Sequence, residues 1–127
     1  MPAMPEHPRD DGPHAALRQL EGEQLSSVEF VRDYLQLRFD GPTLTVTSAL
    51  EVRAEGHRAR MGEPGFRDLL CQRIAETVRF VRVAQGGELL LRFDSGSEIS
   101  ISLRMEDALG GEAVHFFDFE HGEWGVL

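Results

Sequence analysis

Leu-Gln-Leu-Arg-Phe-Asp at residues 35–40 returns as Leu-Leu-Leu-Arg-Phe-Asp at residues 89–94. The flanking segments return in the same order: Val-Glu-Phe-Val-Arg at 28–32 as Val-Arg-Phe-Val-Arg at 78–82, and Leu-Thr-Val-Thr-Ser at 44–48 as Ile-Ser-Ile-Ser-Leu at 99–103. The offset grows from 50 to 54 to 55 residues, so the second copy has gained residues between its elements. An internal repeat predicts that one supersecondary unit buries its apolar face against its twin.

Each copy predicts a three-stranded antiparallel meander. Apolar and polar side chains alternate in residues 35–40, which is the period of a strand with one face on the core and one in water. Asp-Gly-Pro at 40–42 and Asp-Ser-Gly at 94–96 separate alternating runs and indicate hairpin turns. The third strand of the first copy is expected to run on as far as Val52, whereas its counterpart ends near Asp107.

Helices and a closing hairpin are expected beside the two meanders. Apolar residues at helical spacing predict one main helix at about 66–76, and a short N-terminal helix is expected at 15–20. Residues 54–65, with three glycines, are expected to form a loop between the copies, and residues 112–127 a hairpin outside the repeat. The predicted fold class is α+β, with the duplicated meanders forming a curved sheet or an open barrel. The predicted core consists of Val28, Phe30, Leu37, Phe39, Val46, Leu69, Leu70, Ile74, Val78, Phe80, Leu91, Phe93, Ile99 and Ile101.

The length of 127 residues predicts a single domain. Residues 1–13 hold four of the six prolines and are expected to be a disordered tail. The domain is then 14–127, with repeats at about 17–53 and 66–105. No apolar run approaches the roughly 20 residues that span a bilayer, and the first residues lack the apolar stretch of a signal peptide. A cytoplasmic protein is therefore expected, in agreement with the single cysteine.

Charge is distributed unevenly along the chain, whose formal net charge is −9. Residues 25–104 carry eleven acidic and eleven arginine side chains, whereas residues 105–127 carry six acidic side chains and no arginine. This acidic balance argues against nucleic acid and an anionic membrane surface as partners. All thirteen basic residues are arginine, and the absence of lysine and asparagine indicates a GC-rich bacterial gene rather than selection for arginine chemistry.

The sequence contains no motif that identifies a catalytic or metal-binding site. Glu112 with His115 and Asp118 with His121 have a spacing that binds metal on a helix, but their aromatic neighbours favour a strand, on which i and i+3 face opposite ways. Cys71 falls within the predicted helix and is interpreted as a small core residue rather than a nucleophile. No catalytic residue, metal or cofactor is predicted.

Two places where the copies differ are candidate contact sites. Asp33 and Tyr34 form a short connection in the first copy, where the second copy spends a longer one, and a purely structural turn is the alternative. Arg58, Arg60 and Arg67 lie in and after the loop between the copies, where they could hold an anion or could be a solvated linker.

The acidic C-terminal segment is the third candidate contact site. Glu120, Glu123 and Trp124 lie in the expected closing hairpin. Trp124 is interpreted either as a lid on the core or as an exposed anchor for a partner.

The motif Val-x-Phe-Val-Arg-Asp-Tyr-x-Gln-Leu-x-Phe-Asp-Gly at residues 28–41 resembles small bacterial proteins classed as domains of unknown function. The resemblance covers roughly residues 17–126 and implies a free-standing bacterial cytoplasmic protein, with no catalytic residue to carry over. Two function classes remain open. The first is a non-catalytic interaction module, an accessory or neutralising partner of a basic protein, that uses the acidic C-terminal surface. The second is a small-ligand-binding domain with a groove between the repeats, as a monomer or a homodimer. An enzyme is the third and least favoured class.

Overall fold

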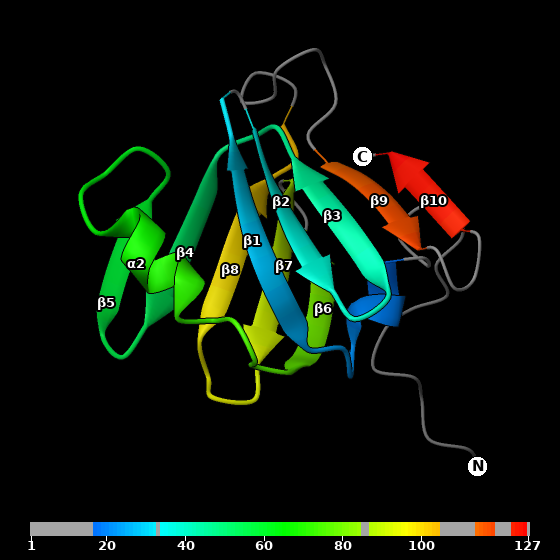
Figure 1. Ribbon diagram of the computed structural model, residues 1–127, viewed down its shortest axis with the longest axis horizontal. Helices are drawn as coiled ribbons and strands as arrows, with labels where there is room; N and C mark the ends of the chain where they lie inside the picture. The colour runs from blue at the N-terminus through cyan, green and yellow to red at the C-terminus, as the bar shows by residue number, and fades with distance from the viewer. Residues whose placement is uncertain (1–16, 33, 85–86, 105–113, 119–122, 127) are drawn as a thin grey trace.

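Two five-stranded antiparallel sheets form the molecule (Figure 1). The computed structural model describes residues 17–32, 34–84, 87–104, 114–118 and 123–126, the last two ranges as backbone only. The first sheet has the order β1-β2-β3-β9-β10 and the second β5-β4-β8-β7-β6. The strands are β1 (Leu25–Val31), β2 (Tyr34–Phe39), β3 (Pro42–Val46), β4 (Leu50–Ala54), β5 (His57–Arg60), β6 (Val78–Ala84), β7 (Glu88–Phe93), β8 (Glu98–Ser102), β9 (Val114–Asp118) and β10 (Glu123–Val126). The helices are the 3-10 helix η1 (Arg18–Leu20) and the α-helix α2 (Phe66–Cys71).

Both predicted three-stranded meanders are present as antiparallel ladders. The turns at 40–42 and 94–96 join β2 to β3 and β7 to β8. Val28 pairs with Leu37 in the first ladder, and Val81 pairs with Leu91 in the second. The strand position that matches Val28 is therefore Val81, and the sequence match of Val28 with Val78 is out of register by three residues.

A β-bulge near the start of β6 explains a wrong core prediction. The register of β6 against β7 shifts between Val78 and Phe80, so alternation along the strand is interrupted there. As a result Val78 and Val81 are both buried, while Phe80 is only half-buried and pairs with the exposed Arg92. β1 carries a similar register shift between residues 25 and 27.

The chain changes sheets after β3, where one continuous strand was expected. β3 pairs with β2 and β9 in the first sheet, whereas β4 pairs with β8 in the second. The expected loop at 54–65 also contains a strand, because Glu55 and Gly56 have φ angles of 53° and 79° and fold β5 back on β4. Two positive φ angles are typical of the type I′ turn, whose twist suits a two-residue hairpin.

The main helix is shorter than predicted. α2 ends at Cys71 and is followed by turns, with Ala75 at a φ of 77°. Phe66 and Leu70 are buried and form its apolar stripe, but Ile74 lies past the end of the helix and is 38% exposed. Cys71 is exposed rather than part of the core, because it is one residue, and so about 100° of helical rotation, away from Leu70.

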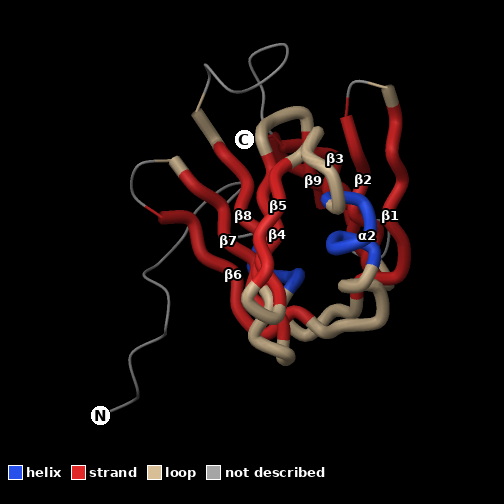
Figure 2. Tube along the Cα trace, turned by 90° about the vertical axis from the view of Figure 1, so that its left-hand side faces the viewer, coloured by secondary structure: helices blue, strands red, loops and turns tan. Residues whose placement is uncertain are grey.

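The inner faces of the sheets form the core, with α2 between them at one side (Figure 2). Most predicted core residues are buried, from Leu37 and Phe39 in β2 to Ile101 in β8; Val28 and Leu69 pack against them partly buried, and Phe30 is exposed. The sheets are joined where Gln24 forms a bridge with Thr77. Of the short helix expected at 15–20, η1 is present and its Leu20 is buried.

The C-terminal hairpin is present at an edge of the first sheet. β9 pairs with β3, and β10 pairs with β9 as the outermost strand (Figure 1). The hairpin takes the place in the first sheet that β4 and β5 take in the second. The expected tail at 1–13 lies outside the described residues. No helix in the described ranges is long and apolar enough to span a membrane.

Candidate functional site

A groove of about 620 Å³ lies where the end of β1 and the start of β2 face the start of α2. Its lining includes Phe30, Tyr34, Met61, Phe66 and Arg67, and we call it the Phe30 groove. Three elements meet there: the β1–β2 hairpin, the segment 61–65 that follows β5, and the first turn of α2. The groove therefore lies at the side of the molecule where α2 fills the space between the two sheets (Figure 2).

Aromatic and apolar side chains form one wall of the Phe30 groove. The rings of Phe30 and Phe66 meet edge to face with centroids 6.5 Å apart, and the Arg67 guanidinium lies 5.4 Å from the Phe30 centroid. Phe66 is buried, but Phe30 is 38% exposed and Met61 is 39% exposed. Apart from Ile74, no other large hydrophobic side chain in the described ranges is exposed, so two of three gather in this groove.

Phe30 is exposed although its register position faces inward. It pairs with the buried Leu35 in the β1–β2 ladder, so it lies on the inner face of the first sheet. β1 is an edge strand, however, and at this end its inner face meets the short α2 instead of a second sheet. One turn and a half of helix cover the ring only in part.

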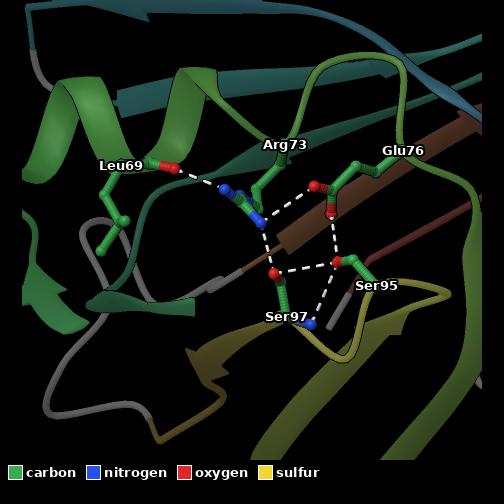
Figure 3. A network of polar contacts seen from close by, with 5 residues as sticks. All are labelled: Leu69, Arg73, Glu76, Ser95 and Ser97. Atoms are coloured by element: carbon green, nitrogen blue, oxygen red, sulfur yellow. Dashed lines mark hydrogen bonds and ion pairs between the residues drawn. The ribbon is translucent and has the colours of Figure 1, made fainter. Parts of the chain in front are cut away.

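A buried ion pair fixes the far end of α2 (Figure 3). Arg73 is 3% exposed; its Nη1 donates to Glu76 Oε2 at 2.9 Å and to Ser97 Oγ, and its Nε donates to the Leu69 carbonyl at 3.3 Å. Ser95 Oγ donates to the second oxygen of Glu76 at 2.8 Å. Because Ser95 and Ser97 belong to the β7–β8 turn, this network ties the end of α2 and the segment after it to the second sheet.

A second groove, of about 600 Å³, hollows the outer face of the second sheet. Four arginines line it from β4, from β5 and from the segment after β8: Arg53, Arg58, Arg60 and Arg104. We call it the arginine groove. Among the described residues that line it, Glu51 and Glu88 are acidic, and none of them also lines the Phe30 groove.

Three of these arginines surround one carboxylate. The Nε atoms of Arg53 and Arg60 each donate to a different oxygen of Glu51 at 3.1 Å, and Arg58 Nε lies 3.8 Å from the second oxygen. Burial raises the pKa of Glu51, but hydrogen bonds from Arg60 and Arg53 and the charges of Arg53 and Arg58 lower it more, so the net pKa is below the ordinary value. Glu51 therefore stays ionised and partly neutralises the groove.

The predicted contact residues fall into separate places. Tyr34 and Arg67 come together in the Phe30 groove, whereas Arg58 and Arg60 line the arginine groove. Glu123 and Trp124 begin β10, paired with residues 118 and 117 of β9. Asp33 and Glu120 lie outside the described residues.

Sequence reasoning missed two residues that these grooves use. Phe30 was assigned to the core, and Met61 was not singled out, whereas Arg53 and Glu51 were already grouped with Arg58 and Arg60 as a basic stretch that glutamates partly neutralise. The available signal for the β4–β5 hairpin was the Glu-Gly dipeptide at 55–56, which follows an alternating run. This hairpin pairs Glu51 with Arg60 and Arg53 with Arg58.

The described residues contain no group of three or more His, Cys, Asp or Glu side chains placed to hold a metal ion. No protein-family model, curated protein or solved structure matches the chain.

Proposed function

We propose that this protein is a non-catalytic binding domain that receives an apolar side chain of a partner protein in the Phe30 groove. The observation that carries the proposal is the gathering of Phe30 and Met61, both exposed, in one groove next to a guanidinium. Scattered exposed apolar side chains are ordinary on a protein surface, but a cluster inside a hollow marks an interaction site. Interface energy is typically concentrated in such pockets, where an aromatic or arginine anchor is buried on binding.

The partner in this proposal is a protein with basic residues at a distance from its apolar anchor, because β10 lies at the opposite edge of the first sheet from β1. Residues 105–127 have a charge of −6, so the acidic hairpin at Glu120 and Glu123 supplies a second, charged contact. Electrostatic contacts of this kind raise the association rate and make it sensitive to salt. The proposal keeps the protein in the bacterial cytoplasm, as an accessory or neutralising partner.

We also propose that the two halves of the chain are copies of one unit that have exchanged their last hairpins. Leu25 N–H donates to the Glu76 carbonyl at 3.0 Å, and Val78 N–H donates to the Glu23 carbonyl at 2.9 Å, on either side of the Gln24–Thr77 bridge. Leu25 pairs with Phe39 and Val78 pairs with Phe93, so Leu25 and Val78 hold equivalent positions in the two ladders. A twofold rotation that superposes them would turn each of the two hydrogen bonds into the other. This exchange supports a pseudo-twofold axis at the bridge.

The terminal hairpins support the same exchange. Leu44 of β3 pairs with residue 116 of β9, and Ile99 of β8 pairs with Val52 of β4. Residue 116 then pairs with 125 of β10, as Val52 pairs with Ala59 of β5. The corresponding unit is thus β1 to β5 and β6 to β10, longer than the repeat that the sequence displays.

The test is capture of a partner with matched variants. Tagged protein at low salt captures proteins from cells that carry the gene, and each captured protein is identified and purified. Phe30→Ser with Met61→Ser should lose the partner, whereas Ile74→Ser, an equally exposed apolar residue outside the groove, should keep it. A partner retained by the double variant, or lost equally with Ile74→Ser, contradicts the proposal.

A small-molecule role is the second candidate, favoured by one observation. The Phe30 groove measures about 620 Å³, within the range of roughly 300–1,000 Å³ typical of ligand pockets. A thermal-shift screen with a metabolite library distinguishes the two. A compound that stabilises the wild type but not Phe30→Ser, together with an empty capture, favours a ligand, and self-association lost in the same variant favours a homodimer.

A further inference from the structure

We propose that the arginine groove binds the phosphate group of a small phosphomonoester. The groove lies on the outer face of the second sheet, and α2 contributes none of its lining residues. This site is independent of the partner contact proposed above, because the two grooves have no lining residue in common.

The charge balance of the groove calls for an anion. Among the described lining residues, Arg53, Arg58 and Arg60 share one carboxylate, that of Glu51, which leaves two positive charges at this end of the groove. A phosphomonoester carries about −1.5 to −2 at neutral pH, which matches that excess. Guanidinium groups are suited to this ligand, since their planar forks donate two parallel hydrogen bonds to phosphate oxygens.

Two arginines of the groove stand directly opposite each other. Arg53 of β4 pairs with Arg58 of β5, and like charges at opposed positions of an antiparallel ladder are destabilising. The nearest cross-strand carboxylate, Glu98, pairs with Arg53 in register but receives both Nε and Nη2 of Arg92, at 2.8 Å and 2.7 Å. Arg53 and Arg58 are left to share Glu51 with Arg60.

Glu51 shows how these guanidinium groups hold an oxyanion. Its two oxygens accept hydrogen bonds at 3.1 Å from Arg53 and Arg60, and its side chain is only 14% exposed, whereas the arginine side chains are largely exposed. The carboxylate therefore lies at the base of the cluster, with the cations projecting around it. Arg58 Nε lies 3.8 Å from Glu51 Oε2, which is too far for a hydrogen bond. An external phosphate would approach from the solvent side and accept a hydrogen bond from Arg58.

The floor of the groove offers further donors and space. Ser100 of β8 pairs directly with Glu51, and Ser102 lies two residues on along the same face. Hydroxyl groups can donate to phosphate oxygens, so the sheet adds neutral donors beside the guanidinium groups. A hollow of about 600 Å³ has room for a phosphate group and a small organic body.

The test is calorimetric titration with glycerol 3-phosphate at low ionic strength. The wild type should bind it, and Arg58→Gln with Arg60→Gln should weaken binding at least tenfold. Glu51→Gln should strengthen binding severalfold, because it removes the carboxylate that competes for the same guanidinium groups. Arg38→Gln is the matched control: Arg38 is an exposed arginine of β2 in the first sheet, paired with Glu29 and outside the groove, so its loss should leave the affinity unchanged.

Each outcome bears on the proposal. Equal affinity for succinate, a dicarboxylate of similar size, would show that the groove does not select phosphate and would overturn the assignment. Absence of binding by the folded wild type would do the same, as would loss of binding in a folded Glu51→Gln protein. If the double arginine variant does not fold, Arg53→Gln takes its place and should also weaken binding at least tenfold.

Discussion

Consecutive parts of one segment contribute to the arginine groove and to the Phe30 groove, yet the two grooves differ in the kind of side chain that they leave in an unfavourable position. Residues 49–60 contribute to the arginine groove, and residues 61–68 to the Phe30 groove. In the first, charged side chains of one sign crowd a sheet face; in the second, apolar side chains remain open to solvent. Both placements cost stability in the free protein, and on that ground we propose a different kind of ligand for each groove.

The largest expected effect contrasts a core aromatic ring with the groove ring. Phe93 is buried in β7, so Phe93→Ala should lower the free energy of unfolding by about 3–5 kcal/mol. Phe30→Ala should lower it by only about 1–2 kcal/mol, because the ring is already partly in water. Urea unfolding of both variants measures the difference, and equal losses would mean that Phe30 belongs to the core and that its groove is closed.

The next effect concerns the network that holds α2. Arg73→Met keeps the volume of the side chain but leaves Glu76 and Ser97 without their buried cation, and should cost about 2 kcal/mol. The cost is at the low end for a buried pair because Glu76 remains partly in water. Urea unfolding gives the cost, and hydrogen exchange should show faster opening of α2.

Arg92→Met is the matched control for that variant. The Arg92 side chain is about half exposed, unlike the buried Arg73, so the loss of its pair with Glu98 should cost about 0.5 kcal/mol. Since α2 lines only the Phe30 groove, Arg73→Met should also leave glycerol 3-phosphate binding unchanged. A loss of phosphate affinity in Arg73→Met would show that the two grooves are coupled.

Apart from the Arg92→Met control, the smallest effect is the pH dependence contributed by Glu51. Its pKa is lowered in the folded protein, so its stabilising contribution is full above the unfolded pKa of about 4.3 and is lost as pH falls through the lower folded value. The wild type should therefore exceed Glu51→Gln in stability by about 1 kcal/mol at pH 7, and by less below pH about 4. A difference that grows with acid would contradict the arrangement of the three arginines.

The strands at the centre of each meander could be predicted from sequence because their alternation is uninterrupted. Leu37 and Phe39 in β2, and Leu91 and Phe93 in β7, are buried as their period of two requires. Alternation failed at β6, where a bulge after Val78 reverses the faces without any change in composition.

Sheet membership could not be predicted from the same signals. Leu44 to Val52 keep one parity, and nothing in that pattern shows that the chain leaves one sheet at Val46 and enters the other at Leu50. For the site, the sequence identified Tyr34, Arg58, Arg60 and Arg67 as polar candidates. The sequence could not identify Phe30, because its position in the alternating pattern predicts an inward, buried side chain. Phe30 is exposed because the short α2, and not a second sheet, lies against this end of β1.

The central claim is that Phe30 forms a wall of a partner site and is no part of the core. The most direct measurement is calorimetric titration of the identified partner into the wild type, Phe30→Ser and Ile74→Ser. We expect the affinity of Phe30→Ser to fall at least tenfold while Ile74→Ser binds as the wild type does, with both variants folded. Equal affinities for all three proteins would contradict the claim.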